Sequence, residues 1–237
     1  MKNNYLVLVL AISIHSISFS QISTTAFDKA VVETETLNKY YLNATNLFVT
    51  NVDSSEFYYL KYRNGLKETS PELCKQKDIE YYNSLGSAYL SIAFSEKNKQ
   101  GYLEQGIKCH QLVLSIDSNN YKSNKNMMIA YYNQGVDHII KGNYCKQQQI
   151  AENVDWNQSS TIPDIEKLLE CVKPEEFEKY KISPCFRSAL PFALKLYRMN
   201  PKDENVLIAL QGIYLGLNDK KNFKLYCRKA KKLSQSK

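Results

Sequence analysis

Apolar residues recur at helical spacing along most of the chain, and the clearest run lies in residues 82–89. Tyr82, Leu85 and Tyr89 are three and four residues apart, which places them on one face of a helix. Gly86 interrupts this face with a small residue, and a small residue among large ones lets a second helix approach closely. The pattern therefore predicts a helix that packs against a partner helix at Gly86.

Comparable helical faces follow at intervals. Residues 106–118 carry a second face, formed by His110, Val113 and Leu114, and polar residues end it. The later faces comprise Asn124, Met127, Met128 and Tyr131; Ala189, Ala193, Leu196 and Tyr197; Leu207, Leu210 and Tyr214; and Phe223, Cys227, Ala230 and Leu233. The series predicts a succession of helix pairs, with lysines on the outer side of the last helix.

Helix-ending residues separate these faces. Gly142 stops one helix, and Pro201 ends the helix that opens at Pro184. Pro191 is expected within the first two turns of that helix, where a missing N–H costs least. The intervening residues, 143–184, are predicted to form an insertion between the two helices of one pair.

The part of the chain before the repeats is also predicted to be helical. Residues 27–48 carry a helical stripe of apolar and aromatic residues, although an irregular one. Residues 56–66 fit either a helix or a strand, and the helix is preferred because the rest of the chain is helical. Ser70 followed by Pro71 is typical of a helix start. A helical N-terminal region is therefore expected in residues 21–78.

Taken together, the faces of residues 82–89 and 106–118 resemble one unit of the tetratricopeptide repeat family, and two degenerate units follow. The resemblance covers residues 79–237. It implies an all-α fold in which antiparallel helix pairs stack as a short right-handed α-solenoid, with a helical insertion at about residues 143–184. It also implies binding of a protein or peptide rather than catalysis.

In that family the first helix of each pair lines a concave groove that binds partners. Carried over by position, the groove candidates are Asn83, Ser87, Lys125, Ile129, Tyr132 and Asn133. The other groove positions are Glu80, Leu90, Ser91, Lys122, Ile208, Gly212, Leu215 and Gly216. The third unit offers no charge, unlike family members that clamp a C-terminal carboxylate, so the mixed groove favours an extended or helical peptide. Ordinary solvated helix faces are the alternative interpretation.

Residues 1–20 have the features of a secretory signal. Lys2 precedes an apolar stretch in residues 5–14, and cleavage is expected before Gln21. The apolar stretch is about half the ~20 residues that a membrane-spanning helix needs. The chain is therefore expected to be exported, to the periplasm or the extracellular space, with a retained anchor as the alternative.

Charge is unevenly distributed within the net +7 of the whole chain. Residues 21–219 contain 22 basic and 24 acidic residues, a net −2, whereas residues 220–237 contain eight basic residues and no acid. The basic end indicates contact with an anionic protein or envelope surface. The alternative is a solvated helix whose last lysines are favoured by the helix dipole. Nucleic acid is not an expected partner of an exported protein.

The cysteines all lie after the expected cleavage site, where disulfides can form. The two ends of the insertion should be neighbours, so Cys145–Cys185 is the preferred disulfide. Closing that loop of about forty residues would contribute roughly 4 kcal/mol. A Cys171–Cys185 bond and free thiols are the alternatives. A metal site of His138 with these three cysteines lacks a short paired spacing and is not expected.

Catalytic signatures are lacking in the sequence, which contains no HExxH, GxSxG, phosphate-binding glycine loop or dinucleotide fingerprint. His110 is expected to be a packed core residue. Trp156 is expected to hold the insertion on the core, with a partner anchor as the alternative. We therefore predict a protein-binding scaffold without enzymatic activity or cofactor. The competing hypotheses are a structural subunit of an envelope assembly that uses the basic last helix, and a Cys/His metal-binding protein.

Overall fold

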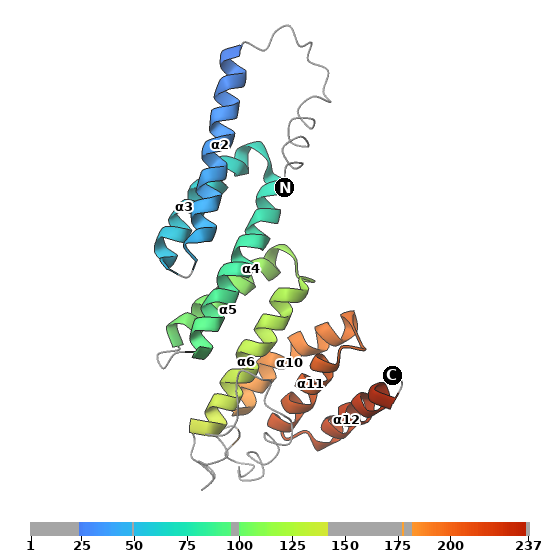
Figure 1. The fold of residues 1–237 in the computed structure, drawn as a ribbon. Coiled ribbons are helices and arrows are strands. Elements are labelled where there is room, and N and C mark those ends of the chain that lie inside the picture. Colours follow the sequence, from blue (N-terminus) through green and yellow to red (C-terminus); the bar gives the residue numbers. More distant parts are fainter. Residues whose placement is uncertain (1–23, 49, 96–99, 142–176, 178–181, 236–237) are drawn as a thin grey trace. The chain divides into compact units, whose positions relative to one another are not determined.

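The computed structural model describes residues 24–48, 50–95, 100–141, 177 and 182–235 (Figure 1). These residues form eight α-helices and no strand, which confirms the all-helical prediction. The helices are α2 (Thr24–Asn46), α3 (Val52–Thr69), α4 (Pro71–Ser95), α5 (Gln100–Ile116), α6 (Tyr121–Lys141), α10 (Ile182–Met199), α11 (Glu204–Gly216) and α12 (Lys220–Gln235). The chain divides into two compact units, residues 1–74 and 75–237, and the division falls within α4.

Helices α2 and α3 pack as an antiparallel pair in the first unit (Figure 1). The Ser55 hydroxyl donates a 2.7 Å hydrogen bond to the Ala44 carbonyl, and both residues are fully buried. The buried ring of Tyr62 lies 4.8 Å from the ring of Tyr41, measured between centroids. Residues 56–66 are helical, as preferred above, because their apolar side chains recur at helical spacing and pack against α2.

Helix α4 begins at Pro71, as the Ser70-Pro71 pair predicted. Proline loses no helical hydrogen bond at the first position. The Ser70 N–H donates to the Leu66 carbonyl at 2.8 Å and closes α3, while the Ser70 carbonyl accepts from the Cys74 N–H at 2.9 Å and opens α4. A single residue thus ends one helix and begins the next.

Helices α4 and α5 approach closely at two buried glycines of the second unit. A Cβ added at Gly86 would lie 2.9 Å from both Cys109 Cβ and His110 Nε2. A Cβ added at Gly106 would lie 2.8 Å from Leu90 Cγ. Both distances are below the 3.0 Å that real Cβ atoms keep. The close approach predicted at Gly86 is therefore confirmed, and Gly106 supplies a second one.

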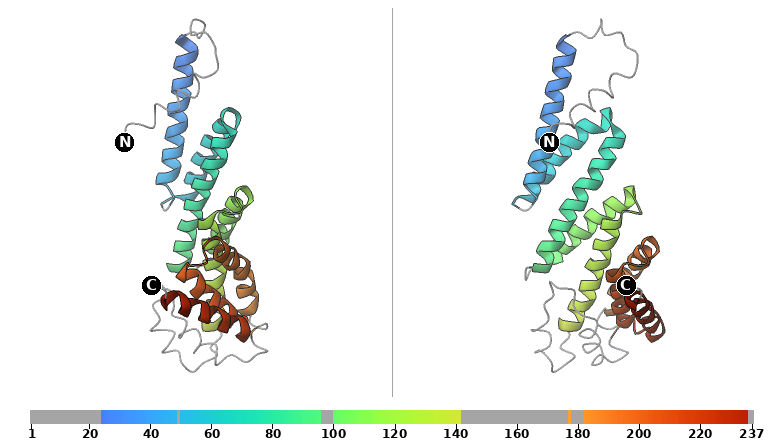
Figure 2. Two further views of the ribbon diagram at one scale, coloured as in Figure 1. Left: turned by 90° about the vertical axis from the view of Figure 1, so that its right-hand side faces the viewer. Right: turned by 45° about the vertical axis from the view of Figure 1, so that its right-hand side comes forward.

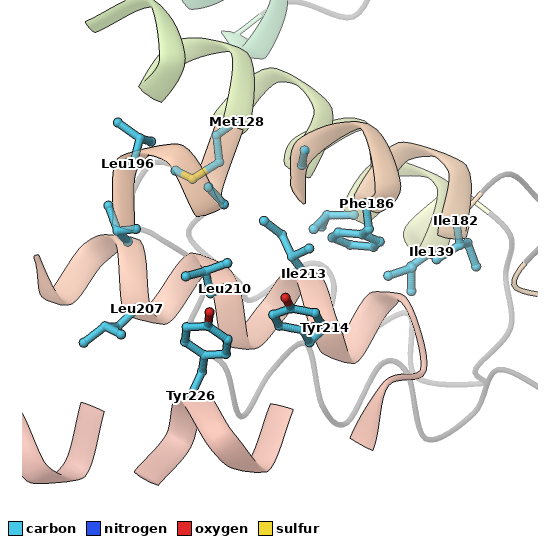
Figure 3. Packing of buried hydrophobic residues seen from close by; sticks show 14 of the residues in the cluster. Met128, Ile139, Ile182, Phe186, Leu196, Leu207, Leu210, Ile213, Tyr214 and Tyr226 are labelled. Atoms are coloured by element: carbon cyan, nitrogen blue, oxygen red, sulfur yellow. The ribbon is translucent and has the colours of Figure 1, made fainter. Parts of the chain in front are cut away.

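A large hydrophobic core joins α6, α10, α11 and α12, and Figure 2 shows α11 and α12 side by side. Phe186 of α10 is fully buried between Gly135 of α6 and Gly216 of α11. A Cβ at either glycine would overlap the Phe186 ring. Figure 3 shows Ile182 of α10 next to Ile139 of α6 in the same core. Two small residues on neighbouring helices thus make room for one aromatic ring.

Helix α10 starts at Ile182, two residues before the expected Pro184. Pro191 therefore lies in the helix interior, and the expectation that it occupies the first two turns was wrong. The physical reason is the complete burial of Ile182, which extends the helix toward the core. An interior proline removes one backbone donor. Tertiary packing compensates for this loss, through the buried residues Phe186, Ala189, Ala193 and Leu196.

The turn between the last two helices is built on Asn218. This residue has a φ of 56°, in the left-handed region that asparagine tolerates better than most residues. Its N–H donates to the Leu215 carbonyl at 2.9 Å, and the Asp219 N–H donates to the Tyr214 carbonyl at 2.8 Å. This pattern is a Schellman motif, which satisfies the last carbonyls of α11. The Asp219 side chain then caps α12 by accepting from the Asn222 N–H at 3.0 Å.

The inner face of α12 matches the predicted apolar positions and adds one more. Phe223, Ala230 and Leu233 are partly buried and pack on the core. Tyr226 was not among the predicted residues, yet it is the most deeply buried side chain of α12, at 6% exposed. Its ring stacks on that of Tyr214 at a centroid distance of 5.3 Å (Figure 3).

Several sequence predictions concern residues outside the described part of the chain. These are the signal at residues 1–20, most of the insertion at 143–184, Trp156, Cys145 and Cys171. The disulfides proposed for Cys185 therefore stay predictions. Within the insertion, Phe177 is described, and it is buried in the same core as Tyr226.

Candidate functional site: a buried histidine network and the α4–α6–α11 face

A set of hydrogen bonds around His110 links three consecutive helices. The imidazole belongs to α5 and is fully buried; its Nδ1 lies 3.2 Å from Ser123 Oγ and its Nε2 lies 3.0 Å from Asn126 Nδ2. Ser123 and Asn126 belong to α6 and also reach α4. Ser123 Oγ donates to Asn83 Oδ1 at 2.6 Å, and Asn126 Nδ2 donates to Ser87 Oγ at 3.0 Å. The ring is thus held between the helix before its own and the helix after it.

The direction of each hydrogen bond follows from the donors present. The Asn126 amide nitrogen can only donate, so we assign His110 Nε2 as the acceptor and place the ring proton on Nδ1. Nδ1–H then donates to Ser123 Oγ, whose own proton goes to Asn83 Oδ1. Asn83 Nδ2 donates in turn to Asn120 Oδ1 at 3.2 Å. A neutral imidazole satisfies this network, whereas a protonated one would direct a second N–H at the Asn126 amide.

The electrostatic setting of His110 keeps the ring neutral. Burial, with a smaller contribution from the Lys122 ammonium, lowers the pKa of His110 from 6.5 to about 4. The ring is 0% exposed and therefore cannot reach a substrate. The structure confirms His110 as a packed core residue, and the satisfied network specifies how α4, α5 and α6 align.

The two groove candidates of α4 both take part in this network. Asn83 is 6% exposed and uses its amide on Asn120 and Ser123, so it is not accessible to a partner. Ser87 is half-buried; it accepts from Asn126 and donates to the Asn83 carbonyl at 2.6 Å. Ser87 therefore lies at the edge between the network and the surface.

The groove candidate Tyr132 of α6 lies against α11. Its ring meets that of Phe186 edge-on at a centroid distance of 5.4 Å. A Cβ added at Gly212 of α11 would overlap the Tyr132 hydroxyl. Burial raises the pKa of Tyr132. Tyr132 therefore joins α6 to α11 instead of projecting from the surface.

A second contact between α6 and α11 was not anticipated from the sequence. Tyr121, at the start of α6, donates a 2.5 Å hydrogen bond to Asp203, the N-cap of α11. This bond is the main cause that raises the pKa of Tyr121 to about 12. Burial opposes ionisation of Asp203, but the Tyr121 hydroxyl, two backbone N–H groups and Lys125 together lower the pKa of its carboxyl. Residues 82 positions apart carry no sequence signal that would pair them.

Groove positions that stay at least partly accessible lie on α4, α6 and α11. Five of them are Ser87 of α4; Lys125, Ile129 and Asn133 of α6; and Ile208 of α11, which is 39% exposed. We call these five residues the α4–α6–α11 face. The groove positions Leu90, Gly212 and Gly216 are buried. The other positions, Glu80, Ser91, Lys122 and Leu215, are exposed or partly exposed. The predicted groove set thus includes buried residues that join the helices and residues that remain accessible.

The described residues hold neither a metal-binding cluster nor a membrane-spanning helix. No group of three or more His, Cys, Asp or Glu side chains gathers there in a way that could hold a metal ion. The hypothetical site of His138 depends on Cys145 and Cys171, which lie outside the described part. None of the described helices is both long and apolar enough to cross a bilayer.

The class of protein that the fold defines is an all-α protein of successive packed helices. No protein-family model matches the sequence. No curated protein matches it significantly. Evidence on function therefore lies in the arrangement of the helices and the chemistry of their surfaces.

Proposed function

We propose that this chain is a degenerate tetratricopeptide-repeat protein that binds a protein or peptide on the α4–α6–α11 face. The observation that carries the proposal is that side-chain contacts join α6 to α4 on one side and to α11 on the other. Asn126 bonds Ser87 across α6 and α4, and Tyr132 covers Gly212 across α6 and α11. Helices joined in this way present a shared surface, as the first helices of stacked repeats do. Stacking as a short right-handed solenoid belongs to the same proposal.

The chemistry of this face supports a peptide with mixed character. Lys125 offers a cation, Ser87 and Asn133 offer hydrogen-bonding groups, and Ile129 and Ile208 offer apolar surface. An amphipathic or extended segment can satisfy such a mixture, with apolar anchors on the isoleucines and backbone or carboxylate groups on the polar residues. A buried, neutral His110 contributes rigidity to the face and no chemistry to a substrate.

Site-specific photocrosslinking tests the proposal directly. A photoreactive residue is placed at Lys125 or Ile208, and at the exposed control positions Lys108 of α5 and Arg198 of α10. In the native host, the first two positions should crosslink to the same partner, and the controls should not. Crosslinks that arise only from the control positions would overturn the proposal, because they would place the partner on α5 and α10.

We further propose that the chain acts after export. The support is the sequence of residues 1–20, with its single Lys2 and its short apolar stretch. Intact-mass measurement of the protein purified from its host tests this point. A mature chain that begins at Gln21 supports export, and a cytoplasmic chain that retains residues 1–20 refutes it.

A further inference from the structure

Most cations of α12 lie on one side of the helix, and the other side packs against the hydrophobic core. At about 100° per residue, six of them fall within an arc of about 120°. They are Lys220, Lys221, Lys224, Arg228, Lys231 and Lys232, and all six are exposed. We call them the α12 basic stripe. The stripe spans residues 220–232 of this helix, so it runs along roughly 18 Å.

The opposite side of α12 packs against the hydrophobic core. Tyr226 is buried there, and Phe223, Ala230 and Leu233 pack beside it. Lys229, at the margin, is held with its ammonium 4.6 Å from the ring centroids of both Tyr197 and Tyr226. The stripe is therefore carried on an anchored helix, and its cations point away from the core.

The described carboxylates neutralise little of the stripe. Hydrogen bonds from Asn222 lower the pKa of the Asp219 carboxyl, and the nearby charge of Lys221 adds to this effect. None of the six stripe cations forms an ion pair with an acidic residue of the described part of the chain. The residues that precede α12 have a net charge of −2 between positions 21 and 219, so the positive charge is concentrated at this end. A one-sided set of cations with so little acidic charge beside it is complementary to an anionic surface of similar length.

The stability of α12 does not account for the stripe. Like charges three or four residues apart repel one another along a helix, as do Lys220 and Lys224, or Lys224 and Arg228. Lys220 and Lys221 also occupy the first turn, where the helix dipole disfavours cations. The dipole argument favours lysines only near the C-terminus. The N-terminal half of the stripe thus opposes helix formation, and an anionic partner would relieve that repulsion.

The geometry points to a partner of one chemical class. We infer that the α12 basic stripe binds an acidic helical segment of another protein, at a surface separate from the α4–α6–α11 face. The stripe residues recur at intervals of three and four positions, the interval at which a second helix presents Asp or Glu on one face. An anionic membrane fits less well, because the apolar side of α12 is buried and Leu225 is the only large apolar side chain of the helix that is exposed, at 37%.

A peptide-binding experiment on the mature chain tests the inference. The probe is a helical peptide of alanine and glutamine with glutamates at three- and four-residue intervals on one face. Its control has the same composition with the glutamates spread around the helix. Fluorescence anisotropy at about 20 mM and about 150 mM NaCl measures binding. The one-sided peptide should bind more tightly, and salt should weaken its binding.

Two matched triple variants assign the binding to the stripe. One is Lys224→Gln/Arg228→Gln/Lys231→Gln, and the other neutralises two lysines and one arginine elsewhere: Lys108→Gln/Arg198→Gln/Lys202→Gln. All six positions are exposed, and circular dichroism checks that both variants fold. Loss of three exposed ion pairs should weaken binding about tenfold in the stripe variant, and the control variant should change it less than twofold.

Three results would overturn the inference. The first is equal weakening by both triple variants, which would mean that only net charge matters. The second is equal affinity for the two peptides. The third is tighter, stripe-dependent binding to vesicles of anionic phosphatidylglycerol than to the one-sided peptide, which would assign the stripe to a membrane. None of these results would affect the crosslinking test of the α4–α6–α11 face.

Discussion

The buried, neutral state of His110 makes a specific prediction about stability and pH. The pKa of the imidazole is 6.5 when unfolded and about 4 in the folded chain. Between these values the unfolded chain binds the proton and the folded chain does not, so acid favours unfolding. The stability that depends on a neutral His110 is fully present above about pH 6.5 and is lost as the pH falls toward 4.

The magnitude follows from the two pKa values. Each pH unit between them corresponds to about 1.36 kcal/mol, so the free energy of unfolding should fall by about 1.4 kcal/mol at pH 5.5. At pH 4.5 the loss should reach about 2.5 kcal/mol. Domains are typically stable by only about 5–15 kcal/mol, so this one group should have a visible effect.

The assay compares wild type with His110→Gln by urea unfolding, followed by circular dichroism at pH 7.5, 5.5 and 4.5. The variant should be less stable at pH 7.5, because its amide cannot reproduce both ring contacts. Its deficit should shrink by about 2.5 kcal/mol at pH 4.5, since the variant has no imidazole to protonate. The control is Val113→Ala, a fully buried neighbour on α5, whose deficit should not depend on pH. A His110→Gln deficit that stays constant across this range would contradict the prediction, as would an NMR titration that places the pKa of His110 above 6.

Three further predictions concern packing and backbone. Phe186→Ala should lower the free energy of unfolding by about 3–5 kcal/mol, measured by urea denaturation, because it empties the space between Gly135 and Gly216. A loss below 1 kcal/mol would contradict that packing. Asn218→Ala should cost about 1 kcal/mol because alanine disfavours positive φ, while Asn218→Gly should be neutral or stabilising; equal effects would contradict the left-handed turn. Gly86→Ala should destabilise the chain and shift the NMR signals of the His110 ring, because the added methyl meets Nε2; unchanged signals would contradict the close approach.

The sequence predicted most of the helices because the signals for them are local. The recurrence of Leu207, Leu210 and Tyr214 marks a buried helix face, and the Ser70-Pro71 pair marks a helix start, without reference to distant residues. The close approach at Gly86 was also predictable, since a small residue within an apolar face indicates a helix contact. The error at Pro191 arose because the helix start was placed from Pro184, whereas burial of Ile182 extends the helix.

The assignment of groove residues shows where local pattern stops being sufficient. Asn83 and Lys125 occupy equivalent positions in successive units, yet Asn83 is buried and Lys125 is partly exposed. Asn83 is buried because Ser123 and Asn120, about forty residues later, bring hydrogen-bonding groups to its amide. A polar side chain can be buried only where such partners meet it.

Local patterns in the sequence were enough to predict that the chain is helical, where several helices end and which helix faces are apolar. The tertiary structure was needed to show which polar residues are buried, that His110 is neutral, and that Tyr121 contacts Asp203. The reason is physical: helical periodicity and capping depend on residues within one or two turns. Burial, desolvation and hydrogen-bond satisfaction depend on groups that folding brings together from distant parts of the chain.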